Sequence, residues 1–227
     1  THKLVGMECL LRWNHPEIGS VPPAAFIPAA EDLGVIVPNG ELVLKEACQT
    51  TSEWIKSGYK ILKLSVNVSP KQFNEINLRK SIASAIRASG LDPQNLLLEI
   101  TESMLMGDVE HNITLLQHIV DLGVGFSLDD FGTGYSSLSY LKKFPIHELK
   151  IDRSFLINVP EINEDNSIVK AIISMAHSLG LNLIAEGVES AEQLDFLRQH
   201  NCNVIQGFYY SKPLSKADFT EFLSNHA

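Results

Sequence analysis

Cysteines, basic clusters and long apolar runs are all scarce in this 227-residue chain. The three cysteines, Cys9, Cys48 and Cys202, lie too far apart for metal-ligand spacing, so we expect reduced thiols in a cytoplasmic protein. No block of five basic residues occurs and the net charge is −9, which argues against a groove that follows a nucleic-acid backbone. No stretch approaches the roughly 20 apolar residues of a membrane span. We therefore expect neither a nucleic-acid polymer nor direct membrane contact.

The chain does contain enough apolar residues, 44%, to bury one sizeable core. It begins without an initiator Met and without a signal-peptide pattern, as an excised domain would. We therefore expect residues 1–227 to form a single domain, truncated at its N-terminus. The larger parent protein can be anchored in a membrane through other segments.

Apolar segments that favour strands alternate along the chain with amphipathic segments that favour helices. Several of the helical segments end at a glycine, a residue that commonly closes helices. Strict alternation of this kind predicts a parallel sheet. The expected strands are 4–13, 62–68, 96–101, 124–130, 148–152, 181–186 and 203–207, and the expected helices are 41–56, 76–88, 109–122, 166–179, 190–200 and 216–224.

Polar residues decide between an open sheet and a closed barrel, because they lie in or at the ends of seven different expected strands. In a barrel such positions converge on one mouth, whereas the outer strands of an open sheet lie too far apart to share a site. We therefore predict an α/β fold of the TIM-barrel-like (β/α)₈ type. Since seven strands are counted, the eighth is expected upstream of Thr1. The polar set is Glu8, Asn67, Glu99, Asp129, Asp130, Lys150, Glu186 and Gln206.

The stretch 126–141, FSLDDFGTGYSSLSYL, is the centre of this pattern. It delivers two adjacent carboxylates, Asp129 and Asp130, from a strand into a glycine-containing loop, and Ser136 and Ser137 then offer caps for a short helix. The Asp pair taken alone is more typical of a solvated turn. Together with the other strand-end acids it predicts a site in which cations balance the charge.

Five carboxylates with one amide oxygen, and neither His nor Cys, suit Mg²⁺ or Mn²⁺ rather than Zn²⁺. Two such ions about 3.5–4 Å apart assist displacement at phosphorus by holding the attacking and leaving oxygens. Lys150 can orient the attacking water, and Arg12 can bind a phosphate oxygen. Metal-dependent phosphoester hydrolysis is therefore the leading prediction. A lyase or isomerase barrel with one metal ion and a lysine base is the competing enzyme class.

Seven motifs occur in order along the chain: ECLLRW at 8–13, NVS at 67–69, LEITES at 98–103, DDFGTGYSSLSYL at 129–141, KIDRSF at 150–155, AEGVE at 185–189 and QGFYYSKPL at 206–214. Their order resembles the EAL domain family, the cyclic di-GMP phosphodiesterases of bacterial signalling. The resemblance runs from Lys3 almost to the C-terminus, and it implies a larger bacterial signalling protein. It also implies hydrolysis of one phosphodiester of cyclic di-GMP to linear pGpG, and often a homodimer.

The resemblance also implies a role for each polar residue. One divalent ion would be bound by Glu8, Asn67, Glu99 and Asp129, and the second by Asp129, Asp130 and Glu186. Lys150 would lie at the catalytic water, with Glu186 as a candidate general base and Glu8 as part of the catalytic set. Substrate contacts and support of the site would come from Arg12, Gln206 and Glu189, and Glu102 would brace the loop that follows the paired aspartates.

Other interpretations of single residues remain. Lys150 can be a structural ion-pair partner, Asn67 a turn cap and Glu102 a helix cap. Cys9 stands where the family usually has Ala, and strand alternation points it away from Glu8, which favours an inert thiol over redox control. The family also has a substrate-contacting glutamine in a segment absent from this sequence. The alternative function is a catalytically silent cyclic di-GMP receptor or protein-interaction domain, although all the expected ligands are present.

Overall fold

The computed structural model of the chain describes residues 3–60, 63–132 and 138–226. It divides into two compact units. The first unit contains Thr1–Glu99, Asp121–Val124 and Thr220–Ala227, and the second contains Ile100–Val120 and Gly125–Phe219. No helix among the described residues is long and apolar enough to cross a membrane.

Three parallel strands form the sheet of the first unit, in the order β1 (Gly6–Cys9), β4 (Lys63–Asn67) and β5 (Leu96–Thr101), the last of which continues into the second unit. Strand β5 reads LLLEIT and is buried over its first five residues. Such an unbroken apolar run is typical of a parallel strand covered on both faces. The predicted strands at 62–68 and 96–101 are therefore confirmed to within one residue at each end.

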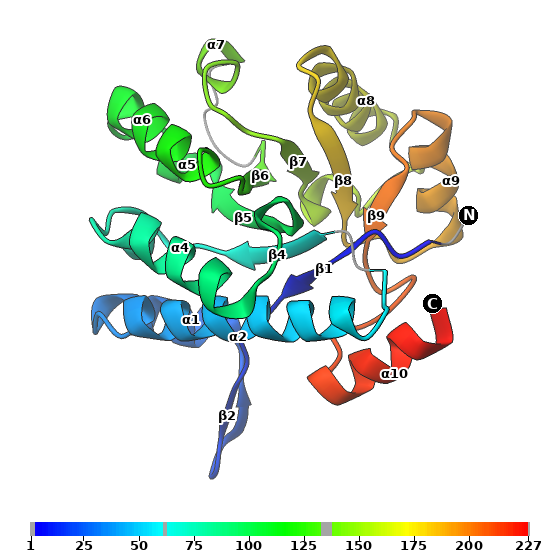
Figure 1. Cartoon of the computed structure of the whole chain (residues 1–227). Coiled ribbons are helices and arrows are strands. Elements are labelled where there is room, and N and C mark those ends of the chain that lie inside the picture. Colours follow the sequence, from blue (N-terminus) through cyan, green and yellow to red (C-terminus); the bar gives the residue numbers. More distant parts are fainter. Residues whose placement is uncertain (1–2, 61–62, 133–137, 227) are drawn as a thin grey trace. The chain divides into compact units, whose positions relative to one another are not determined.

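Helix α2 (Ile36–Lys56) packs against α4 (Leu78–Ser89), and Figure 1 shows the two side by side. Leu44 of α2 and Ile82 of α4 are buried, and the Ser52 hydroxyl donates a 2.9 Å hydrogen bond to the Ser89 carbonyl. The shorter helices of the same region are α1 (Pro23–Asp32), α3 (Pro70–Phe73) and the 3₁₀ turn η1 (Pro93–Asn95).

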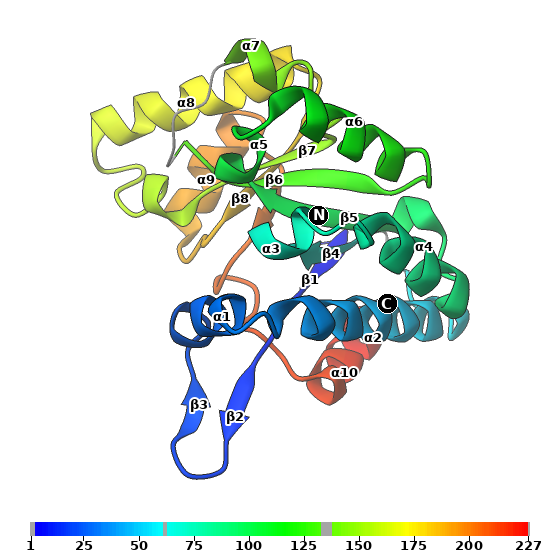
Figure 2. The ribbon, with the colours of Figure 1, turned by 90° about the vertical axis from the view of Figure 1, so that its left-hand side faces the viewer.

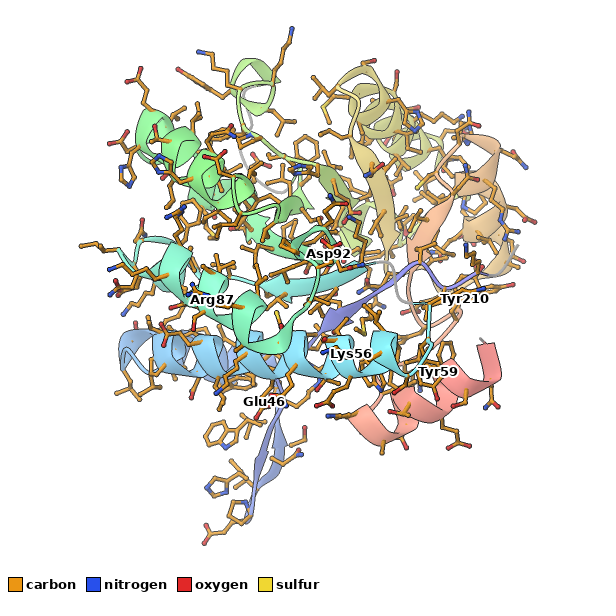
Figure 3. The ribbon with its side chains drawn as sticks, viewed as in Figure 1. Glu46, Lys56, Tyr59, Arg87, Asp92 and Tyr210 are labelled. Carbon is orange, nitrogen blue, oxygen red and sulfur yellow. The ribbon has the colours of Figure 1, made fainter. Side chains whose placement is uncertain are left out.

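Helix α10 (Lys216–His226) returns the end of the chain to α2. The Trp54 indole donates to the Thr220 hydroxyl at 3.0 Å, and the Tyr59 and Ser224 hydroxyls are 2.8 Å apart. Figure 3 shows Tyr59 beside this helix. The last predicted helix, 216–224, is thus confirmed, and it continues to His226.

The single strand predicted over 4–13 is wrong. Strand β1 ends at Cys9, and β2 (Trp13–His15) pairs instead with β3 (Gly19–Val21) in an antiparallel hairpin. Figure 2 shows this hairpin extending away from α1 and α2. Its turn is supported by His15, whose Nδ1 accepts the N–H groups of Glu17 and Ile18. Strand propensity continues through the break, so the apolar pattern alone does not locate it.

Four parallel strands follow in the second unit, in the order β6 (Gly125–Phe131), β7 (Glu148–Ile151), β8 (Asn182–Glu186) and β9 (Val204–Gln206). Figure 1 shows α8 (Asn163–Ser178) and α9 (Ala191–Gln199) flanking β8 and β9. The other helices are α5 (Glu102–Leu105), α6 (Val109–Val120), α7 (Leu138–Leu141) and the 3₁₀ turn η2 (Arg153–Phe155).

The C-terminal ends of the helices were mostly predicted correctly, because glycine residues mark them. Gly58, Gly90 and Gly180 follow α2, α4 and α8 with positive φ angles of 96°, 68° and 71°. Helix α2 begins at Ile36, five residues before the predicted start. Ile36 is buried, and its packing outweighs the weak helix propensity of Pro38 and Gly40 near the start of the helix. The predicted caps Ser136 and Ser137 lie outside the described residues.

The capping box at the start of α9 provides a test of local stability. Ser190 accepts the Gln193 N–H at 3.2 Å and the Gln193 side chain accepts the Ser190 N–H. We expect Ser190→Ala to lower the free energy of unfolding by about 1 kcal/mol in urea denaturation, because one N–H at the helix start loses its acceptor. The control is Ser167→Ala, an exposed serine inside α8, for which a change within about 0.5 kcal/mol is expected. Equal losses in both variants would contradict the capping role.

Candidate active site

Three oxygen-bearing side chains lie at neighbouring strands of the first unit: Glu8 on β1, Asn67 on β4 and Glu99 on β5. Asn67 is in register with Glu99, and its Nδ2 donates a 2.7 Å hydrogen bond to Glu8 Oε1. This bond turns the amide nitrogen towards Glu8, so the oxygen Oδ1 is the atom that Asn67 can offer to a cation. Glu99 is 2% exposed, whereas Asn67 lies at the surface. The three predicted ligands of the first unit thus occupy adjacent strand positions.

Cys9 directly follows Glu8, and its thiol is held in the protonated form. Burial raises the pKa of Cys9, and the negative charges of Glu8 and Glu46 raise it further. Figure 3 places Glu46 on α2, the helix that also contains Cys48. Burial, with a smaller contribution from Cys9, raises the pKa of Cys48 to about 12. Since the thiolate is the reactive form, these environments agree with the inert thiol that the sequence predicted at Cys9.

Lys150 is the centre of the site in the second unit. It lies on β7 with 1% of its side chain exposed, and its ammonium is 2.5 Å from Glu186 Oε1 on β8 and 3.7 Å from Asp129 Oδ1 on β6. A buried ammonium is stable only when opposite charges surround it, and here two carboxylates supply them. Three consecutive parallel strands therefore bring together three residues that the sequence had predicted as one constellation.

A β-bulge positions the paired aspartates. Between the pairs Leu128–Leu149 and Phe131–Ile151, β6 advances three residues while β7 advances two. The extra residue interrupts strict alternation, and Asp130 takes a left-handed φ of 54°. Sequence reasoning assumed a regular strand end and had no signal for the bulge. Aspartate tolerates this backbone conformation better than most residues do.

The pKa of Asp130 reflects its burial and the acidic residues around it. Burial raises its pKa, and the charges of Asp129 and Asp152 raise it further, while Lys150 acts in the opposite direction. Its backbone N–H donates to Asp129 Oδ1 at 2.9 Å, which fixes the neighbouring carboxylate. Negative charge is therefore concentrated at this end of β6, as a cation site requires.

The start of the loop after the aspartates is held from two sides. Glu102, which is 3% exposed, accepts the Gly132 N–H at its Oε2 at 3.2 Å. The ring of Phe155 lies against Gly132, where an added Cβ would come within 2.8 Å of the ring atom Cζ, and the φ of Gly132 is 95°. Sequence reasoning predicted a bracing role for Glu102 but missed Phe155. The KIDRSF motif that ends at Phe155 was the available signal.

The remaining predicted residues lie in different settings. Gln206 ends β9 in register with Glu186, and Glu189 forms a 2.8 Å ion pair with Arg153. Arg153, another residue that sequence reasoning missed, also packs its aliphatic stem against Gly187. Arg12 was predicted inside a strand, but it lies between β1 and β2, where it is exposed and its guanidinium donates to the Leu11 carbonyl.

In each unit the predicted ligand atoms are carboxylate or amide oxygens, without a thiolate or imidazole, and such atoms suit Mg²⁺ or Mn²⁺. Within the described ranges, no three His, Cys, Asp or Glu side chains are grouped closely enough to hold a metal ion. The residue types therefore fit a hard divalent cation.

Comparison with known proteins decides the family. The EAL domain profile matches residues 1–213. This chain belongs to the EAL domain family. It is 43% identical over 211 residues to the bifunctional diguanylate cyclase/cyclic di-GMP phosphodiesterase MucR of Pseudomonas aeruginosa, covering 93% of this chain and 31% of MucR. It is 41% identical to the signaling protein YkoW of Bacillus subtilis, covering 97% of this chain and 28% of YkoW. The chain thus spans about a third or less of these EAL relatives.

Solved structures of EAL domains confirm the predicted TIM-barrel-like α/β fold. The phosphodiesterase PaMucR in complex with c-di-GMP matches 95% of this chain and 87% of its own, with a TM-score of 0.91 and 42% identity. The EAL domain of Mycobacterium smegmatis DcpA matches 82% of this chain and 84% of its own, with a TM-score of 0.78 and 39% identity. Seven parallel strands with intervening helices among the described residues agree with this EAL fold.

Removal of the buried ammonium should destabilise the protein. We expect Lys150→Met, in metal-free buffer, to lower the free energy of unfolding by about 1–3 kcal/mol, because Asp129 and Glu186 lose their cation. The loss is smaller than for a fully buried pair, since the two carboxylates are 16% and 18% exposed. Urea unfolding measures it, and Lys142→Met at an exposed lysine is the control. If Lys150→Met instead raised the free energy of unfolding, the Lys150 ammonium would not be what stabilises Asp129 and Glu186 in the folded protein.

The thiols should be inert in the folded protein. At pH 8 we expect a colorimetric thiol reagent to label, within an hour, on average less than one thiol per protein molecule. Cys48 and Cys202 are buried with pKa values of about 12, and the pKa of Cys9 is also raised. In denaturant all three thiols should react. Rapid labelling of Cys9, located by mass spectrometry, would contradict the inert interpretation.

Proposed function

We propose that this EAL domain hydrolyses one phosphodiester bond of cyclic di-GMP to give linear pGpG. The observation that carries the proposal is its 42% identity, over 95% of the chain, to a phosphodiesterase solved with c-di-GMP. The polar residues support it independently, because acids and a buried lysine at parallel strand ends suit displacement at phosphorus. The reaction would lower the concentration of this second messenger in bacterial signalling.

The proposed cofactors are two divalent ions, Mg²⁺ or Mn²⁺. The ligands from the first unit would be Glu8, Asn67 and Glu99, and those from the second would be Asp129, Asp130 and Glu186. When bound, the ions would polarise the phosphate and lower the pKa of a bound water. The charge of these carboxylates is the physical reason to expect the ions, since acids gathered at a strand end repel one another without a cation.

The residues of the second unit would handle the proton and the developing charge. The water oxygen would bond to phosphorus as the bond from phosphorus to the 3′ oxygen of one ribose breaks. Glu186 would accept a proton from the water, and a proton would return to the leaving 3′ oxygen. Lys150, held between Asp129 and Glu186, would orient the water and stabilise negative charge on the phosphate oxygens.

Substrate contacts are proposed at residues around these groups. The exposed guanidinium of Arg12 can turn from the Leu11 carbonyl to a non-bridging phosphate oxygen. Gln206 and Glu189 would support the end of β8, since Gln206 is in register with Glu186 and Glu189 is paired with Arg153. Glu102 would keep the loop after the aspartates in place through its bond to Gly132. A homodimer and a cytoplasmic location remain predictions from the sequence.

The test is to incubate the purified chain with cyclic di-GMP and Mg²⁺ or Mn²⁺ and separate the nucleotides by chromatography. We expect pGpG with either ion and none in excess chelator. Glu8→Gln should lower the rate about 100-fold or more, because a ligand is lost. Glu17→Gln, at an exposed acid of the hairpin, is the matched control and should keep the wild-type rate.

Other outcomes separate the competing functions. Binding of cyclic di-GMP without product would favour a catalytically silent receptor. Hydrolysis that persists in excess chelator, or in Glu8→Gln at the wild-type rate, would contradict the metal-dependent mechanism. Failure of both binding and hydrolysis would reject cyclic di-GMP as the ligand of this chain.

A further inference from the structure

Gly40 occupies an unusual place for a glycine, inside the 21-residue helix α2. Glycine destabilises a helix interior relative to alanine, so some other contact must explain it. That contact is the side chain of Gln72. A Cβ added at Gly40 would come within 1.9 Å of Gln72 Nε2 and 2.4 Å of its Cδ. The amide of Gln72 therefore lies directly against the backbone of α2.

Gln72 uses its other amide atom to hold the segment that follows β4. Its Oε1 accepts the Ser69 N–H at 3.2 Å, and its own N–H donates to Ser69 Oγ at 3.3 Å. This reciprocal capping box starts the four-residue helix α3. Ser69 is only two residues beyond Asn67, and the intervening Val68 N–H is bonded to the Glu99 carbonyl at 2.9 Å. The path from α2 to Asn67 thus consists of consecutive contacts within the first unit.

Two further contacts keep α3 in place. Phe73 is 2% exposed, and the Lys71 ammonium donates to the Glu31 carbonyl of α1. Asn67 itself lies at the surface, so its side chain has little packing to fix it. Its bond to Glu8 therefore depends on where the backbone of the 67–69 segment is held.

We propose that Gln72 is a positioning residue for the Asn67–Glu8 pair, and that Gly40 is glycine because a side chain there would displace the Gln72 amide. Gln72 touches neither a reacting atom nor a predicted ligand; it acts through Ser69. The link to catalysis rests on the proposed function, whereas the link to the conformation of Asn67 does not.

The decisive variant is Gly40→Ala, because it should disturb the site while leaving the stability of the protein nearly unchanged. The added methyl favours the helix, and the Gln72 amide is the end of a flexible side chain that can move aside. The displaced amide also gives up its bond to the Ser69 N–H, so the gain and the loss should roughly cancel and the urea midpoint should change little. The Mg²⁺ concentration for half-maximal hydrolysis should nevertheless rise roughly tenfold, as expected when a group that supports a metal ligand is lost.

Gln72→Ala should raise the Mg²⁺ requirement to a similar extent, and the double variant Gly40→Ala/Gln72→Ala should be no worse than Gln72→Ala alone, because both changes break the same contact. Gln72→Glu keeps an oxygen to accept the Ser69 N–H and should recover most of the wild-type behaviour. The matched control is Asn74→Ala, which removes the 2.9 Å bond to the Pro70 carbonyl at the other side of α3. It should leave the Mg²⁺ requirement unchanged.

A second readout does not depend on activity. The side-chain amide protons of Asn67, followed by NMR in metal-free protein, should shift in Gly40→Ala and Gln72→Ala but not in Asn74→Ala. If the wild type hydrolyses nothing, the proposed function fails while this resonance still tests the positioning role. An unchanged Asn67 resonance in Gly40→Ala would overturn the inference. It would also be overturned if the Mg²⁺ requirement followed the urea midpoint across all variants, Asn74→Ala included.

Discussion

A lysine ammonium buried between carboxylates is the constraint on which the second unit depends. Lys150 is 1% exposed, and its charge is stable there only because Asp129 and Glu186 lie within 4 Å on the two neighbouring strands. The parallel register of β6, β7 and β8 makes this possible, since it brings the strand ends to one edge. On β6, the bulge between Leu128 and Phe131 and the left-handed backbone at Asp130 lie at the same strand end as Asp129.

Close approach at glycine is the second physical theme, and it recurs next to predicted site residues. Phe155 lies against Gly132, whose N–H is bonded to Glu102, and the stem of Arg153 lies against Gly187 beside Glu186. Gln72 approaches Gly40 in the same way in the first unit. In each case a side chain from one element reaches the backbone of another, which a Cβ would prevent. These contacts hold segments that begin or end at a proposed ligand.

Most of the fold could be predicted from the sequence because its local signals agree with one another. The run LLLEIT, the glycine after α4 and the capping box of Ser190 each identified an element correctly. The errors fell where tertiary contacts outweigh local preference. Trp13 belongs to a hairpin rather than to β1, and its ring packs edge-on against Phe26 at 6.0 Å. The hydrophobic periodicity of the sequence gives no signal for such a contact between two elements.

The sequence by itself determined the family, the alternation of strands and helices, and which residue types are available for metal and phosphate chemistry. These properties depend on residue identity and on spacing along the chain. Tertiary structure decided that Lys150 is buried between two acids, that β6 contains a bulge, and that Gln72 meets Gly40. The physical reason is that ion pairing and close packing depend on distances between elements far apart in the chain, which sequence spacing does not encode.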